Sequence, residues 1–261
     1  MGNEKTKGRQ RVAYCTGLLI LFNFLMYYIY FRTNYNLSES FPSFIENSPT
    51  LFLIRTYLGH LDTKKPFHLQ FTLDSLKSLE NPNWVALLLC TDENPINFED
   101  YTKQDSRILA YPHYEKVTYD EWTAGYDITD KVLEYLKVTN FSAKYIVITN
   151  GDNYYSPQFL NALPSPDTAD IVAVDYWSRY VCAGYNLHPL NMTSTICHHT
   201  IIRLGMVDLG GVLLNYQRFQ KENRRIMKFG PINSQDGFMF QLLVKNGWRI
   251  QYIHKCLFAH S

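Results

Sequence analysis

The sequence has little net charge and few cysteines, and each shortage excludes a class of function. Its 25 Lys and Arg nearly balance its 24 Asp and Glu, and no basic block occurs after residue 50. Nucleic-acid-binding domains carry clustered positive charge, so a polyanionic partner is not expected. The 5 cysteines include no Cys-x-x-Cys pair, which argues against a cysteine zinc site and a disulfide scaffold. Repeats and low-complexity segments are also missing, so we expect one domain.

One long uncharged stretch, residues 12–31, indicates a membrane anchor. A helix of about 20 apolar residues crosses the ~30 Å hydrocarbon core of a bilayer. Lys and Arg are concentrated in residues 1–11, so the positive-inside rule places this tail in the cytosol. A cleaved signal peptide is the alternative, but its apolar region is shorter and is followed by small residues. We predict a signal anchor at 12–31 and a stem at 32–50, with the remaining domain in the lumen.

Glycosylation sequons and cysteines are consistent with a Golgi or endoplasmic reticulum location. The sequons begin at Asn36, Asn140 and Asn191. Cys15 lies in the predicted anchor, and the other cysteines can pair in several ways in an oxidising lumen. Cys90 falls in an apolar run and is predicted to be a buried thiol. Cys182 with Cys197 is therefore the candidate disulfide.

Apolar runs and amphipathic segments alternate from residue 51 to the C-terminus. The predicted strands are 51–57, 84–90, 107–111, 145–149, 171–175, 207–215 and 248–258, and the predicted helices are 67–79, 128–138 and 234–245. This alternation is typical of βαβ units, in which helices connect parallel strands. We therefore predict an α/β domain at 51–261, with a mostly parallel sheet flanked by helices.

The clearest functional signal lies at the end of one predicted strand. The apolar run 145–148 is followed by the short polar cluster Asn150, Gly151, Asp152 and Asn153. A buried strand that delivers a carboxylate and amides at its carboxyl end is the usual way in which an open α/β sheet holds a ligand or metal. For Asp152 the alternative is an Asx turn that merely ends the strand. We predict that the chemistry occurs at this edge of the sheet.

Three strand ends together resemble one known family. Thr56 and Tyr57 end the first strand, Asp92 follows the second, and TNGDNYYSP follows the fourth with residues 150–152 at the positions of a D-x-D motif. This order resembles the GT-A fold of nucleotide-sugar glycosyltransferases, most closely the family 2-like group. The resemblance implies that these residues bind the nucleotide and diphosphate of the donor. A plain turn residue is the alternative for Asp92.

The same resemblance implies functional roles for two residues later in the chain. Asp236 opens the predicted helix 234–245, where inverting members place the general base that accepts the acceptor hydroxyl proton. A helix-capping role is the alternative for Asp236. His260 resembles a late histidine metal ligand of some members and favours Mn²⁺ over Mg²⁺ if it binds, whereas an ordinary surface or core histidine is the alternative.

Two amides distinguish the predicted metal site from the family pattern. Asn150 stands in place of the first Asp of D-x-D and Asn153 follows the motif, so Asp152 is the one certain carboxylate. Mn²⁺ or Mg²⁺ can draw further oxygen ligands from diphosphate and water. Asp152 with a second protein group is therefore sufficient for a metal site.

Two further pairs of residues have less specific patterns. Gly210 and Gly211 precede an apolar run, where they indicate a close backbone approach to the donor sugar or ordinary turn glycines. His198 and His199 are adjacent, and neighbouring residues of an extended segment point to opposite faces. We therefore do not interpret these two histidines as a metal-binding pair.

Two functions of different class follow from these features. The first is a type II membrane-anchored glycosyltransferase that moves a sugar from a nucleotide-sugar donor to an acceptor hydroxyl, with Mn²⁺ or Mg²⁺ and inversion. Its acceptor would be a glycan, glycoprotein or lipid. The second is a catalytically silent GT-A domain that binds a glycan or nucleotide sugar, which Asn150 and Asn153 favour. The presence of both Asp152 and Asp236 favours the enzyme.

Overall fold

The computed structural model describes residues 48–65, 67–114, 125–178, 197–203, 207–226 and 235–260. These residues belong to one compact unit that comprises residues 44–261. The predicted anchor at 12–31 lies outside the described residues, so its prediction is not tested here. None of the helices in the described ranges is both long and apolar enough to cross a membrane.

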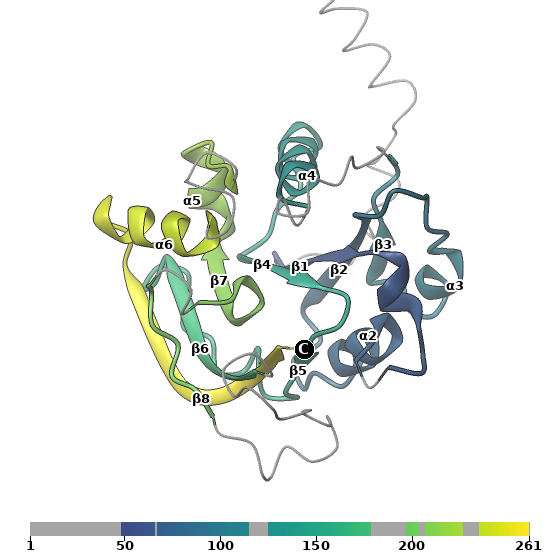
Figure 1. Cartoon of the computed structure of the whole chain (residues 1–261). Coiled ribbons are helices and arrows are strands. Elements are labelled where there is room, and N and C mark those ends of the chain that lie inside the picture. Colours follow the sequence, from purple (N-terminus) through teal and green to yellow (C-terminus); the bar gives the residue numbers. More distant parts are fainter. Residues whose placement is uncertain are drawn as a thin grey trace, which may run out of the picture. The chain divides into compact units, whose positions relative to one another are not determined.

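The described residues form an 8-stranded mixed sheet with the order β3-β2-β1-β4-β7-β6-β8-β5 (Figure 1). The strands are β1 (Thr50–Thr56), β2 (Trp84–Cys90), β3 (Ile108–Ala110), β4 (Tyr145–Asn150), β5 (Tyr154–Tyr155), β6 (Ile171–Ser178), β7 (Val212–Asn215) and β8 (Ile250–His260). The predicted parallel arrangement is confirmed for β1 to β4. It needs correction in the other half, where β7 runs antiparallel to β4 and β6, and β5 runs antiparallel to β8.

Helices flank the sheet on both sides, as the βαβ pattern predicts. They are α2 (Leu69–Lys77), α3 (Glu99–Thr102), α4 (Tyr126–Val138), α5 (Tyr216–Lys221) and α6 (Gln235–Lys245), with 3-10 turns η2 (Leu58–Leu61) and η4 (Leu209–Gly211). In Figure 1, α2 and α4 lie on opposite sides of β1, β2 and β4. Phe52 and Ile54 of β1 join the apolar cluster that contains α2, whereas Leu51 and Leu53 are equally buried on the opposite face.

Short polar side chains explain where several elements begin or end. The predicted strand 207–215 begins only at Val212, because the Asp208 carboxylate accepts a 2.7 Å hydrogen bond from the Gly210 amide and forms the η4 turn. Asn215 caps α5 by accepting a 3.0 Å bond from the Arg218 amide. Gly247 ends the α6 region with a φ of 81°, a conformation that favours glycine.

The observed disulfide joins Cys197 to Cys256, so the predicted pairing with Cys182 is wrong. Cys182 itself lies outside the described residues. The structure pairs β6 in parallel with β8 and sets Cys256 opposite Asp175, beside the segment that carries Cys197. Tertiary strand pairing thus brings Cys256 into contact with Cys197 across a sequence separation of 59. Cys90 is a buried free thiol, as predicted.

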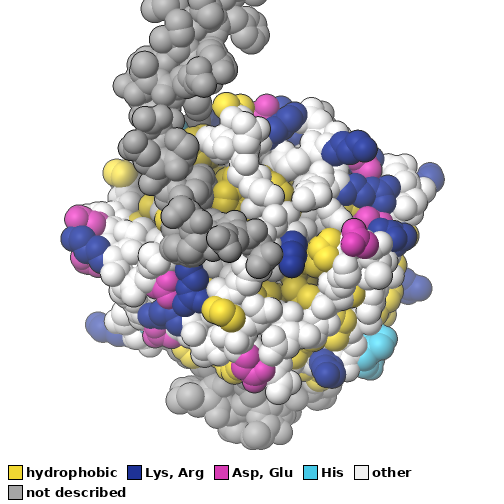
Figure 2. All heavy atoms as spheres, turned by 180° about the vertical axis from the view of Figure 1, so that it is seen from behind, with side chains coloured by type: hydrophobic (Ala, Val, Ile, Leu, Met, Phe, Trp, Pro, Cys, Tyr) yellow, Lys and Arg dark blue, Asp and Glu magenta, His cyan; other side chains and the backbone are white. Residues whose placement is uncertain are grey.

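Charged side chains of both signs are interspersed on the face shown in Figure 2. Lys and Arg alternate there with Asp and Glu, and no large basic field is visible among the coloured residues. This distribution matches the balanced composition of the chain.

Candidate functional site

The carboxyl ends of β1, β2 and β4 lie at one edge of the sheet. β1 pairs in parallel with both neighbours, and the register sets Thr56 opposite the last residue of β2 and Arg55 opposite Asn150. Beyond the strands, the Thr91 amide donates to the Thr56 carbonyl at 2.8 Å, and the Gly151 amide donates to the Arg55 carbonyl at 2.9 Å. The structure therefore brings together the donor-side segments that the sequence predicts.

Asp92 connects the turn after β2 to the turn after β1. Its Oδ2 accepts a 2.8 Å hydrogen bond from the Leu58 amide, and its Oδ1 accepts a 3.0 Å bond from the Asn94 amide. The second bond is an Asx turn, the alternative that the sequence left open. Asp92 therefore orders this edge of the sheet, and its contact with the donor base stays a prediction.

Gly151 allows the chain after β4 to approach η2 closely. A Cβ atom at this position would lie 2.8 Å from Thr56 Oγ1 and 3.2 Å from His60 Nδ1. Both of these polar atoms are buried and have no hydrogen-bond partner among the described residues. Buried polar atoms normally have partners, so this arrangement is expected where a small polar group of a ligand is received. A larger residue at 151 would displace them.

Asp152 faces a histidine that sequence reasoning missed. His60 Nε2 lies 3.3 Å from Asp152 Oδ2, and the two side chains are only 8% and 14% exposed. The Tyr57 ring lies 3.9 Å from the His60 ring, measured between centroids. Because water screens such a buried contact weakly, the carboxylate and the imidazole interact more strongly than a surface pair. His60 is a single histidine in a short turn and carries no periodic signal.

The Asn153 side chain is buried and forms a hydrogen bond within the protein. It is 1% exposed, and its Nδ2 donates a 2.8 Å hydrogen bond to Thr149 Oγ1 in β4. Among the polar residues that follow β4, the carboxylate of Asp152 is thus the only anionic group. This arrangement agrees with the single certain carboxylate in the sequence.

The end of β8 reaches the same edge of the sheet. β5 pairs with β8 and sets Tyr154 opposite Ala259, so the chain directly after Asp152 runs beside the end of β8 (Figure 1). His260 Nε2 lies 3.4 Å from Asp208 Oδ2, a carboxylate that was not predicted as its partner. A contact of His260 with a metal ion stays a prediction.

Gly210 and Gly211 are explained by packing against the core. A Cβ atom at Gly210 would lie 2.6 Å from Phe258 Cζ, and one at Gly211 would lie 3.2 Å from Phe258 Cδ1. The Gly210 carbonyl accepts a 3.2 Å bond from the Tyr155 hydroxyl. Burial raises the pKa of Tyr155 well above its usual value, so this phenol stays protonated and donates. A contact of the glycines with the donor sugar stays a prediction.

The predicted general base lies at the start of α6. The structure describes α6 from Gln235, so Asp236 is in the first turn of this helix, as predicted. Its side chain is outside the described part of the structure. The role of Asp236 as a base therefore stays a prediction.

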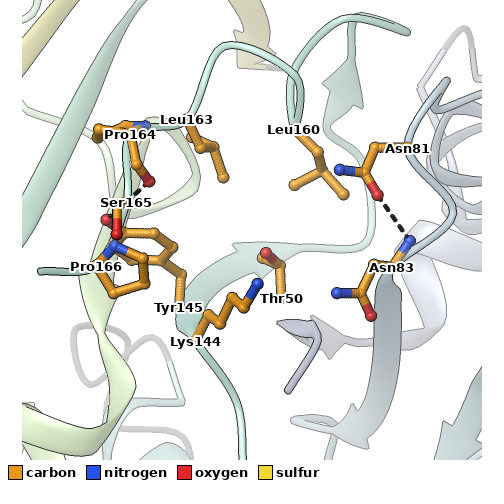
Figure 3. A pocket seen from close by; sticks show the side chains of 10 residues that line it. All are labelled: Thr50, Asn81, Asn83, Lys144, Tyr145, Leu160, Leu163, Pro164, Ser165 and Pro166. Atoms are coloured by element: carbon orange, nitrogen blue, oxygen red, sulfur yellow. Dashed lines mark hydrogen bonds between the residues drawn. The ribbon is translucent and has the colours of Figure 1, made fainter. Parts of the chain in front are cut away.

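The opposite edge of the sheet, where β1 and β4 begin, has a pocket and a cluster of buried charges. A pocket of about 300 Å³ lies at the amino ends of β1 and β4, where Thr50, Lys144 and Tyr145 form part of its lining (Figure 3).

Nearby, the buried Asp170 carboxylate binds Arg249 Nε at 3.0 Å and Arg218 Nη1 at 2.7 Å. Burial alone would raise the pKa of Asp170, but the hydrogen bonds and charges of these arginines lower it. This cluster fixes the start of β6.

Comparison with known proteins identifies the fold. The sequence matches no protein-family model and no curated relative. The structure matches residues 1–349 of S. aureus TarS with a TM-score of 0.53 and 10% identity, over 82% of this chain and 60% of that chain. The same TarS region in complex with UDP-GlcNAc matches with a TM-score of 0.53 and 10% identity, over 81% of this chain and 58% of that chain. Its complex with UDP matches with a TM-score of 0.53 and 9% identity, over 81% of this chain and 60% of that chain.

The chain thus spans less than two thirds of the length of these TarS chains. At such low identity, a likeness between structures establishes the fold and not the activity. The mixed eight-stranded sheet, its flanking helices and this likeness together show that the chain has a GT-A-like α/β fold.

Proposed function

We propose that this chain is a glycosyltransferase that uses a nucleotide-sugar donor. The observation that carries the proposal is the meeting of Thr56, Asp92, Gly151 and Asp152 at the carboxyl edge of three parallel strands. Open α/β sheets bind ligands at this edge. TarS structures with the same fold contain UDP-GlcNAc and UDP. A uridine diphosphate sugar is therefore the first donor to test.

The donor base has suitable partners after β1 and β2. The Tyr57 ring is 36% exposed and offers an aromatic surface for stacking. Asp92 accepts two backbone hydrogen bonds, yet a carboxylate has about four lone-pair sites. Its remaining acceptor capacity can receive an N–H of the base. The Asx turn and the donor contact are thus compatible roles for one side chain.

The residues after β4 fit a divalent metal ion. Asp152 with the adjacent His60 would hold the ion, and diphosphate oxygens and water would complete its shell. One carboxylate with one imidazole favours Mn²⁺ over Mg²⁺, which prefers oxygen ligands alone. When bound, the ion supplies a Lewis acid that stabilises negative charge on the departing diphosphate. His260 is the further predicted ligand, at the adjoining end of β8.

Transfer with inversion also requires a base on the acceptor side. Asp236 is proposed to accept the proton of the acceptor hydroxyl as that oxygen attacks the sugar. Its position in the first turn of α6 favours the anionic carboxylate, because the amino end of a helix carries partial positive charge. Membership of the family 2-like group and inversion are part of this proposal.

Donor turnover tests the proposed activity directly. We expect the purified domain to release nucleotide diphosphate from one member of a nucleotide-sugar panel, and Mn²⁺ to increase the rate. Thermal-shift measurements with the same panel identify the donor, because a ligand that binds the native state raises the melting temperature. If no nucleotide sugar binds with or without Mn²⁺, the proposal is wrong.

A catalytically silent GT-A domain is the second candidate function. Two amides favour it. The buried Asn153 side chain donates its hydrogen bond to Thr149, and Asn150 stands where the family pattern has a carboxylate. Such a domain would bind a nucleotide sugar or glycan in the thermal-shift panel and would turn over nothing in the Mn²⁺ assay. Binding without turnover therefore selects this candidate.

We further propose that residues 12–31 anchor the chain in a Golgi or endoplasmic reticulum membrane with the domain in the lumen. The disulfide between Cys197 and Cys256 is consistent with an oxidising compartment. Asn140 is exposed after α4, where an attached glycan has access to solvent. Membrane anchoring and location rest on the sequence, since the described residues begin at 48.

Protease protection in sealed microsomes tests this topology. We expect the full-length chain to keep an intact domain without detergent, because a luminal domain is enclosed by the membrane, and to lose it when detergent is added. An Asn140→Gln variant should remove one glycan if Asn140 is modified. Digestion of the domain in intact microsomes would rule out the luminal orientation.

A further inference from the structure

Asp175 of β6, His254 of β8 and His199 of the segment after Cys197 lie close together, and none of them is assigned to the donor. His199 Nδ1 lies 2.7 Å from Asp175 Oδ2, and His254 Nδ1 lies 3.4 Å from the same oxygen. One ligand atom from each residue lies within 4.8 Å of the other two. We propose that Asp175, His199 and His254 bind a divalent transition-metal ion, with zinc as the expected occupant. This site is independent of the proposed glycosyltransferase activity.

The disulfide holds the two histidines in place. His199 follows Cys197 by two residues, and His254 precedes Cys256 by two residues. The bond between the cysteines therefore ties together the two short segments that carry the imidazoles, and His254 lies where the pairing of β6 with β8 is irregular, between Ile253 and Cys256. Their ring centroids are 5.2 Å apart. The register of β6 and β8 sets Asp175 opposite Cys256 and completes the cluster.

His198 shows that the clustering is specific. The backbone of His198 pairs with that of Tyr176, and its ring centroid lies 6.0 Å from the Tyr176 ring. It is not a member of the three-residue cluster. The sequence argument that adjacent histidines diverge is therefore correct for the His198 and His199 pair. His199 finds its partners on other strands, which the sequence alone does not reveal.

Burial and hydrogen bonding prepare the carboxylate for a cation. The Asp175 side chain is 2% exposed, and its Oδ1 accepts a 3.1 Å bond from the Thr200 amide. This bond orients the carboxylate and leaves Oδ2 directed toward the imidazoles. A buried carboxylate is stable when a positive charge or metal ion compensates it. The side chains of His199 and His254 are 71% and 64% exposed, so an ion can enter from solvent.

The ligand types and spacings select the metal. Two imidazoles with one carboxylate suit Zn²⁺ and its neighbours in the first transition row, whereas Ca²⁺ and Mg²⁺ require oxygen ligands. A tetrahedral zinc ion with bonds of about 2.0 to 2.2 Å sets its ligand atoms about 3.3 to 3.6 Å apart. The 3.4 Å separation of His254 and Asp175 already matches, and the His199 separation needs a small widening. Water supplies the fourth ligand of a three-residue zinc site.

Zinc titration by calorimetry tests this proposal, using protein without an affinity tag and with its disulfide intact. We expect one zinc ion to bind at this cluster, in addition to any that binds at Asp152 and His60. His199→Ala and His254→Ala should each weaken zinc binding by more than about 10-fold, because even loss of an outer-shell partner costs 10- to 100-fold. Both histidines are exposed, so the melting temperatures without zinc should match that of the wild type. His198→Ala is the matched control and should keep wild-type affinity.

Two further measurements separate this site from other zinc ligands. Asp152→Ala should retain wild-type zinc affinity, because no residue of the cluster is shared with the proposed donor site. Co²⁺ added in place of zinc should give the strong visible absorption of a four-coordinate ion, and His254→Ala should lose it. Equal zinc affinity in the wild type and both histidine variants would overturn the proposal. An equal loss in His198→Ala would also overturn it.

Discussion

Asp152→Ala is expected to lower turnover of the nucleotide-sugar donor by roughly 10² to 10³-fold, the usual cost of losing one stabiliser of transition-state charge. Asp152 is the only carboxylate among the polar residues after β4 and lies 3.3 Å from His60. Without it, the ion that neutralises the departing diphosphate loses its anionic protein ligand. Steady-state rates with and without Mn²⁺ measure the effect. Binding of nucleotide should also lose its dependence on Mn²⁺.

The same variant should remain folded, because Asp152 lies in the turn after β4 and does not belong to the apolar core cluster. Asp62→Ala is the matched control. Asp62 is an exposed aspartate just after η2, and its carboxylate only accepts a local 3.0 Å bond from the Lys64 amide. This control should keep both activity and melting temperature. If Asp152→Ala unfolds while its folded fraction stays active, Asp152 is a structural Asx-turn residue.

The sequence predicts the parallel half of the sheet because its strands are buried on both faces. β2 has the predicted bounds, β1 differs from them by one residue at each end, and β4 extends one residue beyond its predicted end. Continuous apolar runs such as these identify a strand without any periodic pattern. The sequence of a strand does not indicate whether the strand runs parallel or antiparallel to its neighbours. The antiparallel β7 and β5 were therefore not predicted, although β7 lies within a predicted strand.

The site could be predicted as far as it follows from strand ends. Asp92, Gly151 and Asp152 each come directly after a buried strand, and parallel neighbours carry such residues to one edge. His60 and Asp208 could not be found in this way, because each lies in a short 3-10 region that tertiary contacts position. The disulfide depends on the pairing of β6 with β8 across a sequence separation of 59. Contacts of this kind require the folded chain.

Asp236→Asn is expected to lower kcat by roughly 10² to 10⁴-fold, the range for loss of a positioned general base. The amide has nearly the same shape as the carboxylate and can still accept a capping hydrogen bond in the first turn of α6. It cannot take the proton of the acceptor hydroxyl at neutral pH. The loss should therefore appear in the chemical step, while the donor Kd changes little. Single-turnover rates with a saturating donor measure that step.

Asp100→Asn provides the matched control for this substitution. Asp100 is an exposed aspartate in the first turn of α3, so its change also removes an acidic group from the start of a helix. We expect this control to keep wild-type kcat, because α3 contacts β3 at the edge of the sheet and carries no residue of the proposed site. A wild-type kcat in Asp236→Asn with acceptor present would place the base elsewhere or indicate retention of configuration. The assignment of α6 to the acceptor side would then have to be withdrawn.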